Sequence, residues 1–122
     1  MTAQRDRSRR RRPRWIFTVL VHGPSMVPTL RHGDALLVRR TAAGRTGGVA
    51  VVRFDGDPTL YVKRLHHRVD GGWWALGDNA IASTDSRTYG PAHVLGRVLL
   101  RWWPRPSRVG SYVQPGDEHA EV

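Results

Sequence analysis

The stretch VAVVRFDGDPTLYVKRL, residues 49–65, decides the fold that this sequence predicts. β-Branched and aromatic residues are frequent in both of its halves and favour strands at 49–54 and 59–65. The Asp-Gly-Asp-Pro between the halves is typical of a turn. Four further runs of this kind occur at 15–22, 35–40, 73–77 and 93–103. Because no segment shows convincing helical periodicity, the sequence predicts an all-β domain.

The second half of this stretch contains the only lysine of the chain, Lys63. Lysine and arginine total 20, so the other nineteen basic residues are arginines. In a strand, Lys63 shares a face with Tyr61 and Leu65, whereas Arg64 points to the opposite face. An apolar face lowers the pKa of an amine, and a buried lysine can then act as a base, which arginine cannot do. We therefore interpret Lys63 as a candidate general base.

A second candidate residue lies in the stretch GPSMVPTL, residues 23–30. Pro24 and Pro28 each fix φ and remove a backbone donor, so no regular helix or central strand runs through this stretch. Such a stiff loop presents the hydroxyl of Ser25, although an incidental serine in a surface turn would give the same pattern. A serine hydroxyl is a weak nucleophile that needs an adjacent base. Ser25 and Lys63 together therefore suggest a serine–lysine dyad.

The third informative stretch is GDNAIASTDSRTYGP, residues 77–91. Its polar side chains are those of Asp78, Asn79, Ser83, Thr84, Asp85, Ser86 and Arg87. The stretch is either a solvated loop rich in turn-forming residues or a platform that holds a hydroxyl group near the base. In the second case Arg87 pairs with Asp85 or with Asp78, and the sequence leaves both pairings open.

In this order, the three stretches resemble the serine–lysine proteases of the signal peptidase I family. GPSMVPTL, YVKR, and GDN followed by STDSRTYGP carry the resemblance, which covers roughly residues 20–100, most of the part expected to fold. The resemblance implies an antiparallel, barrel-like β-domain with serine endopeptidase activity. The short length is most like the soluble branch that removes the N-terminal propeptide of nickel-type superoxide dismutase. The alternative is a signal peptidase that cleaves the signal peptides of exported proteins at the membrane.

The same resemblance implies a role for each matching residue. Ser25 is the nucleophile, and Lys63 is the neutral base that later returns its proton to the leaving amine. Ser83 orients the lysine amine, Met26 lines the substrate groove, and the backbone N–H of Ser25 supplies an oxyanion donor. The supporting residues are Asp78, Asn79, Asp85 and Arg87. Gly23 stands where some family members carry a serine as a second oxyanion donor, so a backbone N–H or water replaces it, or catalysis is slower.

The remaining sequence sets the expected limits of the domain. The chain has 122 residues, a net charge of +10 and no cysteine, which excludes disulfides and thiolate nucleophiles. We expect a disordered basic arm at 1–14, a peptidase domain at 15–104 and a flexible tail at 105–122.

The expected location follows from the arm and from the apolar run WIFTVLV at 15–21. Seven arginines between Arg5 and Arg14 would allow weak contact with anionic lipid. The apolar run is shorter than the roughly 20 residues of a membrane-spanning helix. We therefore expect a cytoplasmic protein or, as the alternative, one that is peripheral on the cytoplasmic membrane.

A basic nucleic-acid-binding module is the third hypothesis, since self-cleaving repressors of the SOS type also use a serine–lysine dyad. No helix-turn-helix pattern precedes Ser25, so we expect a protein substrate and no specific nucleic acid. The six histidines are scattered along the chain, and we expect no metal site and no cofactor. Each tryptophan pair, 73–74 and 102–103, is expected to place one ring in the core and one on the surface.

Overall fold

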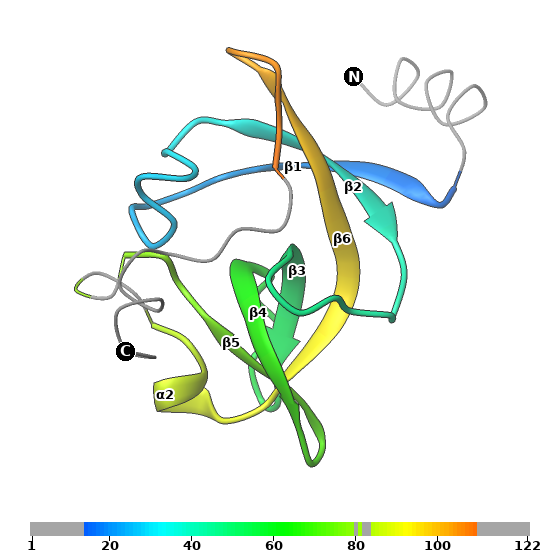
Figure 1. The fold of residues 1–122 in the computed structure, drawn as a ribbon, viewed down its shortest axis with the longest axis vertical. Coiled ribbons are helices and arrows are strands. Elements are labelled where there is room, and N and C mark those ends of the chain that lie inside the picture. Colours follow the sequence, from blue (N-terminus) through cyan, green and yellow to red (C-terminus); the bar gives the residue numbers. More distant parts are fainter. Residues whose placement is uncertain (1–13, 80, 82–83, 110–122) are drawn as a thin grey trace.

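The computed structural model describes residues 14–79, 81 and 84–109. Its elements in this part of the chain are β1 (Ile16–Leu20), β2 (Ala35–Arg40), β3 (Val49–Phe54), β4 (Tyr61–Val69), β5 (Gly72–Leu76), α2 (Ser86–Tyr89), β6 (Ala92–Trp103) and β7 (Ser107–Arg108). The prediction of an all-β domain is confirmed. Among the described residues, α2 is the one α-helix, and it has only four residues (Figure 1).

All strand pairs are antiparallel, and the sheet has the order β1-β2-β6-β3-β4-β5. β5 also pairs with β6 at Trp73 and Ala92, so β6, β3, β4 and β5 close into a ring. The long strand β6 joins the two parts of the sheet, since its first half pairs with β3 and its second half with β2 (Figure 1). This arrangement is the antiparallel, barrel-like sheet that the resemblance implies.

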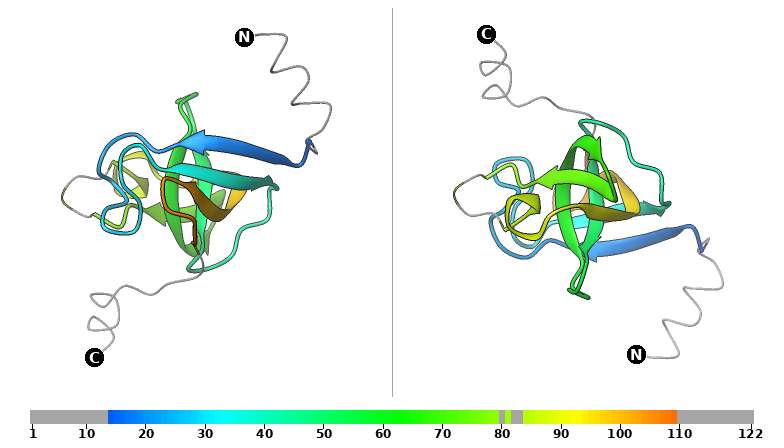
Figure 2. Two further views of the ribbon diagram at one scale, coloured as in Figure 1. Left: turned by 90° about the horizontal axis from the view of Figure 1, so that it is seen from above. Right: turned by 90° about the horizontal axis from the view of Figure 1, so that it is seen from below.

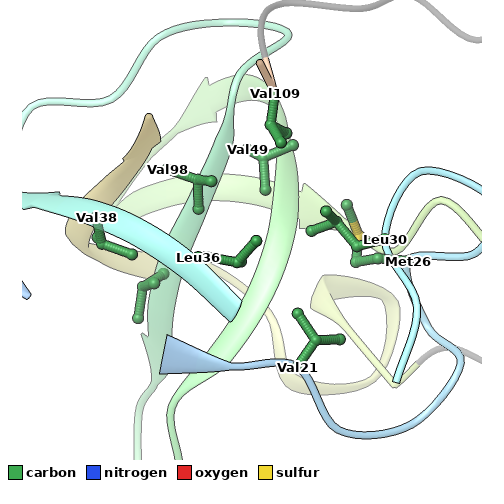
Figure 3. Packing of buried hydrophobic residues seen from close by; sticks show 9 residues of the cluster. Val21, Met26, Leu30, Leu36, Val38, Val49, Val98 and Val109 are labelled. Carbon is green, nitrogen blue, oxygen red and sulfur yellow. The ribbon is translucent and has the colours of Figure 1, made fainter. Parts of the chain in front are cut away.

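Two apolar cores lie on the two faces of the central strands. The first core contains Val21, Met26, Leu30, Leu36, Val38, Val49, Val51, Val98 and Val109 (Figure 3). The second core contains Ala50, Val52, Phe54, Leu65, Trp73, Ala75, Ala92 and Val94. Alternate residues of β3 enter each core, so this strand is buried on both faces, which explains its unbroken apolar run.

The chain continues the sheet beyond residue 104, where the sequence analysis expects a flexible tail. β7 pairs with β6, and Val109 packs in the first core with 8% of its surface exposed. Trp73 is in the core, but the expectation for the second tryptophan pair is wrong. Trp102 and Trp103 are both exposed, at 45% and 55%, and they lie at the end of the ladder with β2.

Two connecting segments lie together at one end of the molecule. Figure 2 shows the loop between β1 and β2, residues 21–34, beside the segment between β5 and α2. A backbone hydrogen bond from Asn79 to Ser25 joins the two segments. Across the described residues, no helix combines the length and the apolar character that crossing a bilayer requires.

Candidate active site

The loop that carries Ser25 is fixed by its own turns and by two buried side chains. The N–H of Val27 donates to the carbonyl of Pro24 at 3.1 Å, and that of Leu30 donates to Met26 at 2.9 Å. Met26 and Leu30 are 1% and 0% exposed and point into the first core (Figure 3). Ser25 itself is half-buried and directly precedes the first of these anchors. The stiff loop predicted from the two prolines is therefore anchored by two side chains that pack in the first core.

Met26 does not have the position that the resemblance implies for it. A residue that lines an open substrate groove would be exposed, whereas Met26 is almost fully buried. Its sulfur accepts a hydrogen bond from the backbone N–H of Asp78 at 3.4 Å. Methionine fills irregular core space well, so here it anchors the loop beside Ser25.

Asn79 connects the Ser25 loop to the polar segment that follows β5. Its backbone N–H donates to the carbonyl of Ser25 at 2.8 Å, and its side-chain amide donates to the carbonyl of Pro24 at 3.1 Å. These two bonds orient both peptide groups next to the serine. The resemblance implies a supporting role for Asn79, and these two hydrogen bonds are the contacts through which it would act.

Lys63 lies in β4, where it pairs with Ala50 of β3, and only 2% of its surface is exposed. Its amine lies 5.6 Å from the centre of the Tyr61 ring. Burial lowers the pKa of Lys63, Asp85 raises it, and Arg87 lowers it further. Burial and the direction of the pKa shift agree with a lysine on an apolar face, and its role as the base stays a prediction.

The neighbouring ring of Tyr61 is held in its neutral form. Its hydroxyl donates a hydrogen bond to the carboxylate of Asp57 at 2.7 Å. This bond raises the pKa of Tyr61, because loss of the phenol proton would place two negative charges together. The ring beside Lys63 therefore carries no charge of its own, and burial remains the main cause of the lowered pKa of Lys63.

Replacing Lys63 with methionine should raise the free energy of unfolding at neutral pH, since methionine, unlike the amine, does not have to give up a proton when it is buried. Each unit by which burial depresses the pKa corresponds to about 1.4 kcal/mol. Between the lowered pKa and the ordinary value of 10.5, the unfolded chain binds a proton that the folded chain lacks. The wild type should therefore gain stability as the pH rises through this window.

Urea unfolding of both proteins at several pH values measures this difference, which should shrink towards high pH. A methionine variant that is less stable than the wild type at neutral pH would show that the amine is not under strain from burial.

Asp85 and Arg87 form the pair that the sequence left open. The two carboxylate oxygens of Asp85 accept hydrogen bonds from Nε and a terminal nitrogen of Arg87, at 3.0 and 2.8 Å. Asp85 also accepts the backbone N–H of Gly77 at 2.9 Å and caps the start of α2. It is 1% exposed and acts on the pKa of Lys63, so its carboxylate lies within electrostatic range of the amine.

Asp78 has a different partner, Arg64, which the sequence analysis missed. Nε and a terminal nitrogen of Arg64 donate to the two carboxylate oxygens of Asp78, each at 2.9 Å. The remaining terminal nitrogen donates to the carbonyl of Gly47 at 2.7 Å, and Asp78 also accepts the hydroxyl of Thr29. The side chains of Arg64 and Asp78 are only 2% and 1% exposed.

This buried network connects β4, the Ser25 loop and the segment after β5. Thr29 belongs to the Ser25 loop, and Arg64 is the residue next to Lys63. A bidentate arginine–carboxylate pair is geometrically specific, so it fixes the strand that carries the lysine relative to the loop that carries the serine. The signal in the sequence was an arginine in the predicted strand, directly after the lysine.

The structure does not describe Ser83, and it shows another partner for the N–H of Gly23. Ser83 lies outside the described residues, and its role in orienting the lysine amine stays a prediction. Gly23 does not offer its N–H to an oxyanion here, because that N–H donates to Nδ1 of His32 at 3.1 Å. Within the described residues, no group of three or more histidine and acidic side chains is arranged to hold a metal ion.

Comparison with known proteins gives a consistent picture. The family model described as Peptidase S24-like matches residues 4–99. The mitochondrial ATP-independent inner membrane protease subunit 1a of Arabidopsis thaliana is 37% identical, over 79% of this chain and 75% of the relative. The mitochondrial inner membrane protease subunit 1 of Xenopus tropicalis is 34% identical, over 73% and 70%, and that of Schizosaccharomyces pombe is 30% identical, over 75% and 77%.

These comparisons correct the location that we expected. The relatives are named as proteases of an inner membrane, which contradicts the prediction of a cytoplasmic protein. The short apolar run at 15–21 predicted the wrong location, because the length of one run does not decide whether a protein works at a membrane. None of these three names mentions superoxide dismutase, so they agree better with the alternative of a signal peptidase.

Proposed function

Because the chain belongs to the Peptidase S24-like family, we propose that it is a membrane-associated serine–lysine endopeptidase that removes N-terminal signal segments from proteins delivered to that membrane. The observation that carries the proposal is the burial of Lys63. Lys63 is the only lysine of the chain, it is buried in β4, and burial lowers its pKa. Placing an amine there costs stability, which is typical of a functional residue.

In the proposed reaction the neutral amine of Lys63 removes the hydroxyl proton of Ser25, and the oxygen attacks the scissile carbonyl. The negative charge that develops on the carbonyl oxygen is stabilised by the backbone N–H of Ser25, which has no other acceptor within the described part of the chain. The lysine then gives its proton to the leaving amine. A water molecule that gives a proton to the same amine then attacks the acyl-enzyme, the removed signal segment leaves with a free carboxylate, and the proton returns to the oxygen of Ser25.

The charges near the amine suit a base that is protonated only briefly. Burial and Arg87 favour the neutral form, which takes the proton. Asp85 favours the charged form, and its attraction limits the cost of the ammonium during the reaction. Asp85 itself stays fixed by Arg87 and Gly77, so it holds its distance while the lysine changes charge.

The substrate class is tested with two precursors, each incubated with the full chain and with a Ser25→Ala variant. One is a membrane-inserted precursor with an N-terminal signal segment, presented in lipid vesicles. The other is a soluble precursor of nickel-type superoxide dismutase, the narrower function suggested by the sequence. Intact mass of the products identifies the cleaved bond.

We expect cleavage of the vesicle-bound precursor by the wild type and none by the serine variant. If only the soluble dismutase precursor is cleaved, the chain is a dedicated maturation protease, and the proposal of signal removal at a membrane is wrong. If the serine variant cleaves either precursor as fast as the wild type, Ser25 is not the nucleophile.

A further inference from the structure

Two histidines meet at the base of the Ser25 loop. His22 begins the loop and His32 lies near its end, and their rings contact edge to face with centroids 5.5 Å apart. Backbone bonds join the same two ends of the loop. The N–H of Val21 donates to the carbonyl of Asp34, and that of Gly33 donates to Val21, both at 2.8 Å. The two histidines therefore lie where the two ends of the loop are hydrogen-bonded to each other, and Ser25 lies in the loop between these ends.

The ring of His32 also contacts the backbone directly. Its Nδ1 accepts the N–H of Gly23 at 3.1 Å. Gly23 has φ of +82°, a left-handed conformation that side chains rarely adopt, and an added Cβ would meet no atom within 4 Å. The backbone conformation, not the available space, therefore requires glycine here. A hydrogen bond that holds this peptide group sets the direction of the backbone at Gly23, two residues before Ser25.

We propose that His32 is a positioning residue for the nucleophile. Its Nδ1 holds the turn at Gly23 and thereby orients Ser25 towards the base and the substrate. This inference rests on the proposed function, since it concerns the same serine. The bond uses Nδ1 as an acceptor, which a substitution can keep or remove. The bond also withholds the N–H of Gly23 from the oxyanion, which leaves the N–H of Ser25 as the donor nearest the nucleophile.

Two substitutions at His32 separate the hydrogen bond from the ring. Asparagine places its side-chain oxygen near the position of Nδ1 and can accept the same N–H. Phenylalanine keeps the aromatic contact with His22 and cannot accept it. His22→Phe is the matched control, because it keeps the ring contact and leaves the bond between His32 and Gly23 in place.

We expect His32→Phe to lower kcat between roughly tenfold and a hundredfold with little change in KM, the cost of a misplaced nucleophile. His32→Asn should retain most of kcat, and His22→Phe should stay within about threefold of the wild type, since it removes no hydrogen bond to the loop. The thermal midpoints of all three variants show whether they are folded. Equal losses for the asparagine and phenylalanine variants, or no loss for either, would overturn the proposal.

A second readout does not depend on activity. In amide NMR spectra, the resonances of Gly23 and Ser25 should move in His32→Phe and stay near their wild-type positions in His32→Asn. If the wild type cleaves no precursor, the proposed function fails, and these resonances still decide whether His32 holds the turn. Unmoved amides in the phenylalanine variant would show that it does not.

Discussion

Lys63→Arg should abolish cleavage, although it keeps the positive charge and much of the side-chain length. Arginine stays protonated in proteins, so it cannot take the hydroxyl proton of Ser25. General-base catalysis contributes roughly 10²- to 10⁴-fold, and removing a residue that acts together with the nucleophile costs on the order of 10⁶-fold in comparable enzymes. Single-turnover cleavage of the vesicle-bound precursor measures the loss.

Ser25→Ala provides the comparison for this experiment. If serine and lysine act as one unit, the Ser25→Ala, Lys63→Arg and combined variants should have similar residual rates, because the second change has nothing left to remove. Full activity in Lys63→Arg would identify another group as the base. Additive losses in the combined variant would show that the two residues act independently.

Asp78→Leu should destabilise the protein by about 3–5 kcal/mol, because it leaves the guanidinium of Arg64 buried without its countercharge. The side chains of both residues are almost fully buried, so water cannot replace the lost carboxylate. The change also removes the acceptor for Thr29, and the Ser25 loop loses that tether. Urea unfolding gives the loss of stability, and cleavage by the remaining folded protein gives the effect on the loop.

The chain offers a matched control in an exposed contact between a histidine and a carboxylate. His93 and Asp55 also lie in contact, at 2.7 Å, but their side chains are 36% and 79% exposed. Asp55→Asn should therefore change the free energy of unfolding by less than about 1 kcal/mol. Adding Arg64→Met to Asp78→Leu should recover much of the loss, since an apolar pair of similar volume needs no countercharge. Equal effects of the Asp78 and Asp55 changes would contradict the importance of burial.

Local patterns in the sequence predicted most of the sheet. The strands at 35–40 and 49–54 have the predicted bounds, because turn residues flank both apolar runs. β4 begins at Tyr61, two residues later than predicted, and continues to Val69. Pairing with β5 sets this extension. The sequence of one strand does not show which other strand will pair with it in the fold.

The site was predictable where residue type alone indicates chemistry. A single lysine among arginines identified Lys63, and its burial follows from the alternation of the strand. The same alternation placed Arg64 on the other face, but it did not show that this face is covered too. Arg64 is buried because Asp78 and Gly47 meet its guanidinium, and those residues are distant in the sequence. The position of Met26 in the core was missed for the same reason.

The central claim, that the neutral amine of Lys63 is the base, can be tested through chemical rescue because the chain has no cysteine. Lys63→Cys introduces one thiol, which is alkylated in the unfolded chain with 2-bromoethylamine to rebuild a lysine-like amine, or with iodoacetamide as the control. After refolding, the pH dependence of single-turnover cleavage is measured for both products. We predict that only the aminoethylated protein is active, with its acidic limb moved to lower pH, because the sulfur makes the new amine less basic. Equal activity of the two products, or an acidic limb that stays at the wild-type pH, would contradict the claim.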